Sequence, residues 1–210
     1  NWGLGKKLFY YDEEDNWVKA VYLSVDGEPS LDADDGVAIY ELEYDACGNV
    51  IAVYYKNHEG GFMLPEMYGV AGYLYEYDDN GFICKQSAVG VDGVVEFSAR
   101  HQCAIILCEC NEYGFVVKQT YCDADGNMCA NREGSAYVTS VTDERGNCLE
   151  WWSYGVDGEL AETQYGNAGK KMEYDEKGCV IKETYYGVDG EPCLVADGIA
   201  GYTYEYNMHQ

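Results

Sequence analysis

The sequence predicts an all-β protein made of tandem β-hairpin repeats of roughly 32–33 residues, stacked into an elongated twisted sheet or solenoid. A turn motif of the form Tyr-Asp-x-x-Gly recurs at a nearly constant spacing, and a segment with alternating tyrosines precedes it. The composition joins 22 Tyr and 25 Gly with only three Pro. Tyrosine is favoured in strands and glycine in turns, so composition and periodicity agree.

The turn motif sets the length of the repeat. Clear copies begin at Tyr44, Tyr77 and Tyr174, and degenerate copies fill the gaps. Successive copies start at positions 11, 44, 77, 110, 142, 174 and 206, so the period is 33 at first and 32 later. A fixed period of this size is typical of a repeat architecture. We therefore predict a single array over residues 1–210, with partial repeats at 1–10 and 206–210 and whole repeats between them.

Two further landmarks keep their place in the repeat. An Asp-Gly pair follows each start at a fixed distance, as Asp26 follows Tyr11, with Glu59 and Gly60 as the one variant. A Gly-x-Ala segment precedes the next start, as Gly36 precedes Tyr44, with the exception of 102–104. The Asp-Gly pair is expected to form a type I′ turn, in which both central residues have a positive φ. The Gly and Ala of Gly-x-Ala are expected where neighbouring backbones approach too closely for a large side chain.

Each repeat is interpreted as a long hairpin followed by a short third strand. Ala200, Tyr202, Tyr204 and Tyr206 alternate with other residues and so share one face of a half-buried strand. The Asp of the turn motif is expected to accept a hydrogen bond from the backbone two residues on, and its Gly to supply a positive φ. The third strand is expected after the Asp-Gly pair, as at 191–194.

The hairpins must stack, because a single hairpin cannot bury its own apolar face. Equivalent positions then form ladders, and we expect the tyrosines to make a continuous spine. A buried aromatic ring contributes up to about 1.5–3 kcal/mol by area, so a few in each repeat can hold an array together. Stability would then be a sum over the interfaces between neighbouring repeats.

Charge and hydropathy exclude several classes of partner. Acidic residues outnumber basic ones 38 to 13, for a net charge of −25, so nucleic acid and anionic membranes are repelled. No apolar run approaches the roughly 20 residues of a membrane span, so no membrane insertion is expected. The chain begins without a Met and stops in mid-pattern, which suggests a piece of a longer protein.

These landmarks resemble two bacterial β-repeat families. The Tyr-Asp-x-x-Gly turn followed by an apolar strand resembles the tyrosine-aspartate repeats of bacterial shell and toxin proteins, whose period is shorter. The Gly-x-Ala strand, the period and the Asp-Gly turn resemble tryptophan-glycine repeat proteins, although the only Trp-Gly pair here is Trp2 and Gly3. The resemblance covers the whole chain. It implies a surface-associated or secreted scaffold, or a binding module attached to other domains.

A calcium site is one candidate. Asp123, Asp125 and Asn127 have the spacing with which a calcium loop begins, where alternate oxygens point at one cation. The acidic residue that completes an EF-hand is absent, since Asn131 and Arg132 follow. The segment also coincides with the Asp-Gly turn of every repeat. The turn interpretation is therefore favoured, with weak calcium binding at Asp123 and Asp125 left open and no other cofactor expected.

Aromatic side chains off the ladder are candidates for ligand binding. Rings on a sheet can stack on sugar faces while carboxylates accept hydrogen bonds from hydroxyl groups. Trp151 and Trp152 are adjacent, so in a strand they face opposite sides, and one of them should be exposed. With Tyr154 in the same strand, they form the candidate binding site. The ladder tyrosines are expected to be core residues instead.

The ten cysteines permit a metal site but do not require one. Cys103, Cys108, Cys110 and Cys122 cluster in the middle repeats, and a zinc site needs four converging ligands. However, Cys108 and Cys110 occupy positions that hold tyrosine in the last repeat. We therefore favour cysteine as a small buried hydrophobe. No Cys-x-x-Cys pair occurs, and a disulfide scaffold is not required for a chain of this size.

The favoured function is a non-catalytic module of a bacterial surface or multidomain protein, binding a protein or a glycan through an extended face. His58, His101 and His209 fall at unrelated positions of the repeat, and no nucleophile has a companion base at a recurrent distance. One alternative is a structural stalk or a self-assembling fibre subunit that associates through its ends. Another is a hydrolase formed where the middle repeats depart from the pattern. The acidic repeats favour the cell surface or secretion, whereas the irregular cysteines favour a reducing compartment.

Overall fold

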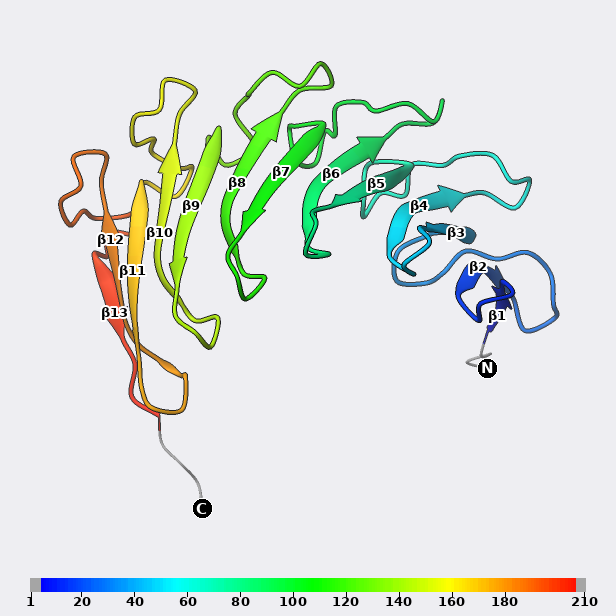
Figure 1. Ribbon diagram of the computed structural model, residues 1–210, viewed down its shortest axis with the longest axis horizontal. Coiled ribbons are helices and arrows are strands. Elements are labelled where there is room, and N and C mark those ends of the chain that lie inside the picture. The colour runs from blue at the N-terminus through cyan, green and yellow to red at the C-terminus, as the bar shows by residue number, and fades with distance from the viewer. Residues whose placement is uncertain (1–4, 207–210) are drawn as a thin grey trace. The chain divides into compact units, whose positions relative to one another are not determined.

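The computed structural model describes residues 5–206, and all regular structure in this part of the chain is β-strand. Of the partial repeat at 206–210, only Tyr206 is among the described residues. The pair Trp2 and Gly3 lies outside them. The chain forms two compact units, Asn1–Ile105 and Ile106–Gln210, called here the N-terminal half and the C-terminal half. Within each half the strands pair in chain order, each antiparallel to the next (Figure 1). The predicted class of tandem β-hairpins in one open antiparallel sheet is confirmed.

The strands alternate between a six-residue and a seven-residue type. The N-terminal half holds β1 (Lys6–Tyr11), β2 (Trp17–Leu23), β3 (Ile39–Tyr44), β4 (Val50–Lys56), β5 (Gly72–Tyr77) and β6 (Ile83–Val89). The next strand, β7 (Ile105–Cys110), begins at Ile105, the last residue of the N-terminal half. The C-terminal half continues with β8 (Val116–Cys122), β9 (Tyr137–Thr142), β10 (Cys148–Tyr154), β11 (Gly169–Tyr174), β12 (Val180–Tyr186) and the short β13 (Gly201–Thr203). None of the described residues forms a helix of the length and hydropathy that a bilayer requires.

The turn motif is held by its acidic residue. Asp45 Oδ1 accepts hydrogen bonds from the backbone of Cys47 (2.8 Å) and of Asn49 (2.9 Å), and Gly48 has a φ of 85°. The same pair of bonds is made by Asp12, Asp78, Asn111, Asp143 and Asp175. The expected bond to the residue two positions on is confirmed, and a second one, four positions on, closes the turn.

The Asp-Gly pair forms the same kind of turn, which corrects the type I′ prediction. Gly27 has a φ of 85°, but no positive φ occurs at Asp26. The N–H of Ser24 donates to the carbonyl of Glu28 (2.8 Å), and the N–H of Gly27 donates to that of Ser24 (3.0 Å). This is a tight turn followed by a glycine bulge, which needs a positive φ only at the glycine.

The predicted third strand is also wrong. After the last Asp-Gly turn, pairing is limited to a bridge between Tyr186 and Pro192 and a bond from the N–H of Cys193 to the carbonyl of Tyr185 (3.0 Å). The chain then turns into a loop at Val195, whose N–H donates to Ile199. Only Leu194 lies between the last paired residue, Cys193, and this loop, so the segment cannot extend its pairing into a strand.

The Gly-x-Ala segment serves two separate purposes. Its Ala is fully or almost fully buried wherever a further repeat follows, at Ala38, Ala71, Ala104, Ala136 and Ala168. Ala200, after which the structure describes only part of a repeat, is exposed. The Gly has a positive φ, and its surroundings vary: a Cβ added at Gly36, whose φ is 75°, would meet no atom within 4 Å, whereas one added at Gly134 or Gly166 would lie 3.3 Å from the backbone of the next repeat. The crowding prediction therefore holds for the Ala, for Gly134 and for Gly166, and is wrong for Gly36.

The tyrosine of the turn motif ties each repeat to the one before it. The hydroxyl of Tyr44 donates to the carbonyl of Trp17, the first residue of β2 (2.9 Å). Equivalent bonds join Tyr77 to Val50, Tyr174 to Cys148, and Tyr206 to Val180. Where the motif has Thr142 instead of tyrosine, Ser140 makes the bond, to Val116 (2.7 Å). We call this recurring bond the hydroxyl latch.

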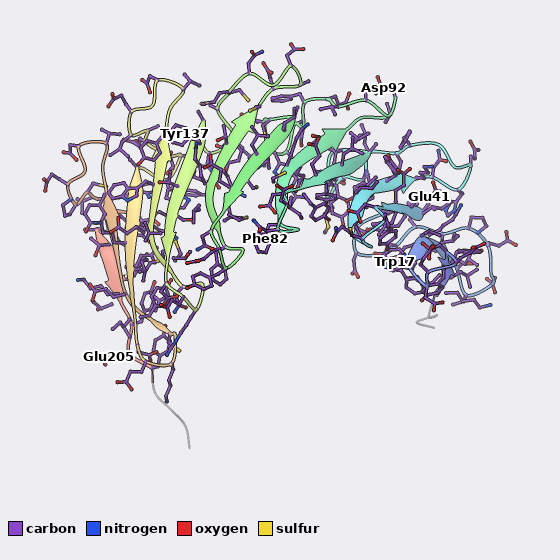
Figure 2. All side chains as sticks on the ribbon, in the orientation of Figure 1. Trp17, Glu41, Phe82, Asp92, Tyr137 and Glu205 are labelled. Carbon is purple, nitrogen blue, oxygen red and sulfur yellow. The ribbon has the colours of Figure 1, made fainter. Side chains whose placement is uncertain are left out.

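The two faces of the sheet differ in chemistry. Side chains project from both faces of the sheet (Figure 2). On the face opposite the tyrosine ladders, glutamates pair with lysines of neighbouring strands, as Glu41 does with Lys19 (3.1 Å). Such half-exposed pairs each contribute little to stability. On the ladder face of the N-terminal half, ring contacts run from Tyr22 through Tyr40 and Tyr55 to Tyr73, with centroids 5.4–6.4 Å apart. The predicted spine is continuous in this half.

Candidate functional site

The loop that leads into each Gly-x-Ala, and includes the first two residues of that motif, differs in length between the halves. In the N-terminal half it has six residues, at 32–37, 65–70 and 98–103; in the C-terminal half it has five, at 131–135, 163–167 and 195–199. Gly36 donates four residues back, to Asp32 (3.0 Å), whereas Gly134 donates three residues back, to Asn131 (3.1 Å). The change of period from 33 to 32 is therefore the loss of one residue from this loop.

In the N-terminal half the six-residue loops cover the ladder face. The ring of Tyr68 stacks on Tyr55 with centroids 4.5 Å apart, and only 5% of Tyr55 is exposed. The hydroxyl oxygen of Tyr68 lies 3.3 Å from the hydroxyl oxygen of Tyr40, and the Tyr68 hydroxyl donates to Asp35 Oδ2 (3.3 Å). Val37, Val70, Tyr73 and Ala88 complete this buried cluster. The last residues before the loop glycines thus close the face.

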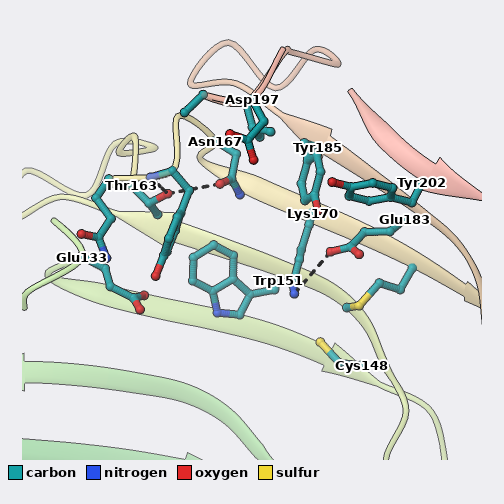
Figure 3. A pocket seen from close by; sticks show the side chains of 15 residues that line it. Glu133, Cys148, Trp151, Thr163, Asn167, Lys170, Glu183, Tyr185, Asp197 and Tyr202 are labelled. Carbon is teal, nitrogen blue, oxygen red and sulfur yellow. Dashed lines mark hydrogen bonds and ion pairs between the residues drawn. The ribbon is translucent and has the colours of Figure 1, made fainter. Parts of the chain in front are cut away.

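In the C-terminal half the same positions leave the ladder face open. Tyr165 is 55% exposed, and a groove of about 700 Å³ lies between the five-residue loops and the strands (Figure 3). Its lining comes from all three loops of this half and from β10 to β13. The loops contribute Glu133, Thr163, Gln164, Tyr165, Asn167, Val195, Ala196 and Asp197, and the strands contribute Cys148, Trp151, Lys170, Met172, Glu183, Tyr185 and Tyr202.

Strand register places the floor of the groove. Trp151 pairs with Lys170, and Lys170 pairs with Tyr185, so these three side chains share a face. Glu183 pairs with Tyr202 in the adjoining row of the same face. Figure 3 shows the indole of Trp151 in the middle of this floor.

Polar bonds fix the middle loop. Thr163 Oγ1 donates to Asn167 Oδ1 (3.1 Å), and Asn167 Nδ2 donates to the carbonyl of Gly169 (3.2 Å). Thr163 and Asn167 are both buried. The N–H of Gln164 donates to the carbonyl of Glu133 in the preceding loop (3.0 Å), and a corresponding bond links the next pair of loops. The loops therefore form a backbone-bonded wall.

The groove is acidic. Lys170 Nζ lies 3.5 Å from Glu183 Oε1, so its charge is offset within the floor. Burial and the neighbouring charge of Glu183 raise the pKa of Tyr185 to about 12, so its phenol is neutral at physiological pH. Within residues 5–206, the carboxylates of Glu133 and Asp197 make no ion pair and accept no hydrogen bond from a side chain or the backbone. Two negative charges thus remain unbalanced in the lining of the groove.

The predicted aromatic site is divided between the two faces. Trp151 and Trp152 do face opposite sides, but both are half-buried, so the expectation of an exposed tryptophan is wrong. The ring of Trp152 covers Gly169 so closely that an added Cβ would collide with it, and its Nε1 donates to Glu150 (3.1 Å). Tyr154 stacks on a neighbouring tyrosine with centroids 4.6 Å apart. Of the three predicted residues, only Trp151 lines the groove.

The predicted calcium ligands belong to a turn. Asp123 Oδ1 accepts from the backbone of Asn127 (2.8 Å) and of Asp125 (3.0 Å), and these bonds, with the Asn127 side chain, lower the pKa of Asp123. The carboxylate therefore closes the Asp-Gly turn. Across residues 5–206, no three side chains of His, Cys, Asp or Glu are grouped so that they could hold a metal ion. Calcium binding at this turn stays a prediction.

The clustered cysteines lie at packed positions. Cys103 and Cys122 are buried, and Cys108 and Cys110 are half-buried. Burial raises the pKa of the Cys122 thiol, which favours the neutral form. This placement fits the interpretation of cysteine as a small hydrophobe.

Comparison with known proteins gives only distant likenesses. No protein-family model and no curated protein matches the chain. Among solved structures, it is similar to the TcdB2-TccC3 complex with Cdc42 (11% identity over 86% of this chain, TM-score 0.43) and to TcdB2-TccC3 without its hypervariable C-terminal region (12% over 95%, TM-score 0.41). It is also similar to the Photorhabdus luminescens Tc holotoxin pore (11% over 86%, TM-score 0.36). The chain covers 9–11% of those chains, and at such TM-scores the likeness carries no argument about function.

Proposed function

We propose that this chain is a non-catalytic recognition module of a bacterial surface or multidomain protein, and that it binds a protein or glycan partner on the ladder face of its sheet. The groove over Trp151 carries this proposal, because the same face is closed by Tyr68 in the N-terminal half and open in the C-terminal half. The module would lie on the cell surface or be secreted.

The dimensions and lining of the groove support binding. Ligand sites in proteins usually have volumes of about 300–1,000 Å³ and combine apolar walls with a few fixed polar groups. The groove has about 700 Å³, an indole and phenol rings in its floor, and a wall of loops joined by backbone hydrogen bonds. A site held in this way loses little conformational entropy when a ligand binds.

The lining also supports a role without catalysis. It includes no histidine, and its one thiol, Cys148, donates to the carbonyl of Glu150 (3.3 Å). Burial raises the pKa of the Cys148 thiol, which keeps it protonated and a poor nucleophile. The groove therefore offers shape and hydrogen-bond acceptors rather than an activated nucleophile.

Arrays of immobilised peptides and glycans, probed with the whole chain, test the proposal. We expect specific binding that is lost in Trp151→Leu and retained in Trp152→Leu, because the two rings lie on opposite faces. Circular dichroism and the midpoint of urea unfolding establish that each variant is folded. A folded chain that binds no array member, or variants that bind equally well, would overturn the proposal.

A structural stalk or fibre subunit is the second candidate, and the edge of the sheet favours it. Every residue of β1 is exposed, including Phe9 and Tyr11, and among residues 5–206 β1 pairs with β2 alone, along one of its two edges. Sedimentation over a range of concentrations decides this point. Assembly that is abolished by Phe9→Lys supports the fibre, whereas a monomer at the highest concentration rejects it.

A further inference from the structure

Adjacent tryptophans in β10 differ in what lies over their rings. Lys171 Nζ lies 5.8 Å from the ring centre of Trp152 and 5.6 Å from that of Tyr186. Elsewhere a lysine lies 4.6 Å from the ring centre of Tyr22. Among residues 5–206, no lysine or arginine lies over Trp151, although an indole is the most favourable aromatic partner for a cation. Within the described residues no cation covers this indole, and Lys170, its cross-strand neighbour, pairs with Glu183 instead.

The unpaired charges in the lining of the groove have the sign that a cation needs. Glu133 and Asp197 line the groove from two different loops, and neither carboxylate has an ionic or hydrogen-bonding partner among the described residues. Lys170, the one cation of the floor, is already 3.5 Å from Glu183. A carboxylate only accepts hydrogen bonds, so these two groups match a ligand that only donates them.

A basic peptide fits these features better than a sugar. Sugar hydroxyls donate and accept, and they are best recognised by amides that can do both. The amide of Asn167 is buried and serves the wall, since it accepts from Thr163 and donates to the carbonyl of Gly169, so Gln164 is the one other side-chain amide in the lining. The net charge of −25 also steers a cationic partner toward the chain.

We propose that the groove binds a basic peptide segment, with a lysine or arginine side chain seated on the indole of Trp151 between the carboxylates of Glu133 and Asp197. This inference rests on the proposed function and names its ligand. The volume of about 700 Å³ holds more than one side chain, so the peptide backbone runs along the groove and not across its mouth.

Calorimetric titration of the whole chain with short peptides tests the inference. The probe is a capped pentapeptide of alternating glycine and lysine, and the neutral control has norleucine in place of lysine. We expect binding of the lysine peptide only, weakened about tenfold in the double variant Glu133→Gln with Asp197→Asn. Trp151→Leu should weaken binding of the lysine peptide by more than the double variant does. Trp151→Phe should bind it more tightly than Trp151→Leu, because a phenyl ring also attracts cations.

General attraction to an acidic protein is separated by a matched variant. Glu14→Gln with Asp34→Asn removes the same charge from exposed positions of the N-terminal half. Its affinity should stay within about twofold of the unmodified chain at 0.15 M salt, where exposed charges are screened beyond about 8 Å. Equal losses in the two double variants would overturn the inference.

Other outcomes separate this inference from the proposed function. Equal binding of the norleucine peptide would show apolar recognition and would overturn the cation site. A chain that binds a glycan in the array but no lysine peptide would retain the proposed function and reject the basic peptide. Because the carboxylate-to-amide changes are nearly isosteric and lie at the surface of the groove, loss of folding is not expected in those variants.

Discussion

The two halves of the chain repeat one hairpin but bury different groups beneath their loops. In the N-terminal half, Val70 and Ala88 lie in a buried cluster with aromatic rings. The equivalent positions of the C-terminal half hold Ser135 and Ser153, whose hydroxyls are 2.7 Å apart and fully buried. The apolar half is closed by six-residue loops, and the polar half carries five-residue loops and the groove.

This difference shows how a repeat array can gain a site without losing its frame. Strand lengths, turns and the hydroxyl latch are common to both halves, so the hydrogen-bonded scaffold does not depend on loop length. The loop that differs by one residue is where Tyr68 covers the ladder face in the N-terminal half and where the groove lies in the C-terminal half. Function on a rigid scaffold is commonly carried by such variable loops.

The largest test of the comparison removes one ring from each half. Tyr55 and Tyr185 occupy the same position of the repeat, but Tyr55 is enclosed by Tyr40, Tyr68 and Tyr73, whereas Tyr185 borders the groove. Tyr55→Ala should lower the free energy of unfolding by about 3–5 kcal/mol, as for other buried aromatic rings. Tyr185→Ala should cost about 1–2 kcal/mol, because less area leaves water when that half folds.

Urea unfolding followed by circular dichroism measures both values. Equal costs would mean that Tyr185 is as enclosed as Tyr55, and the groove would then be closed in solution. A change in the slope of the transition would show that the halves unfold separately, and each would then be analysed by itself.

The second test exchanges the buried polar pair for its apolar equivalent. Ser153→Ala leaves the hydroxyl of Ser135 buried without its partner and should cost about 1–3 kcal/mol. The double variant Ser135→Val with Ser153→Ala copies Val70 and Ala88, so it should recover most of that loss. A double-mutant cycle in urea measures the coupling. Additive costs would contradict a direct bond between the two hydroxyls.

The frame of the fold could be predicted from the sequence because each element has a local cause. The turn motif pairs an Asp acceptor with a Gly of positive φ, and both act within one short turn, as at Asp45 and Gly48. Alternation of tyrosines assigns the face of each strand. The Asp-Gly dipeptide does not separate a type I′ turn from the observed turn, because the two share that dipeptide and differ in the φ of the residue before glycine.

The site was harder to predict because it depends on what a loop fails to cover. Trp151 could be identified as a candidate from its place beside Trp152, but the sequence does not show that Tyr68 stacks on the ladder face while Tyr165 stays largely exposed. The shortening of the period from 33 to 32 was the available signal. Locating its effect at the groove requires the positions of Glu133 and Asp197 in three dimensions.

The third test concerns what the halves share. Tyr77→Phe and Tyr174→Phe each remove one hydroxyl latch while keeping the ring, so each should cost about 1 kcal/mol, the usual net worth of a hydrogen bond. Tyr165→Phe is the control, since its exposed hydroxyl makes no such bond, and it should change stability by less than about 0.5 kcal/mol. Unequal costs at the two latches would show that the scaffold is not the same in both halves.

The smallest effect is expected from the acidic turns. Hydrogen bonds from the side chains of Asn49 and Asn147 and from the backbone lower the pKa of Asp45 and of Asp143, one in each half. A carboxyl whose pKa is lowered by folding adds stability above its unfolded pKa of about 3.9, and this stability is lost as the pH falls through the folded pKa. Asn111 accepts the same two backbone hydrogen bonds without carrying a charge.

Asp45→Asn and Asp143→Asn should therefore reduce, by similar small amounts, the fall in the thermal unfolding midpoint between pH 6 and pH 2. Thermal unfolding at a series of pH values measures this fall. An unchanged fall in both variants would place the acid sensitivity elsewhere, and a change in only one of them would mean that the turns of the two halves do not contribute alike.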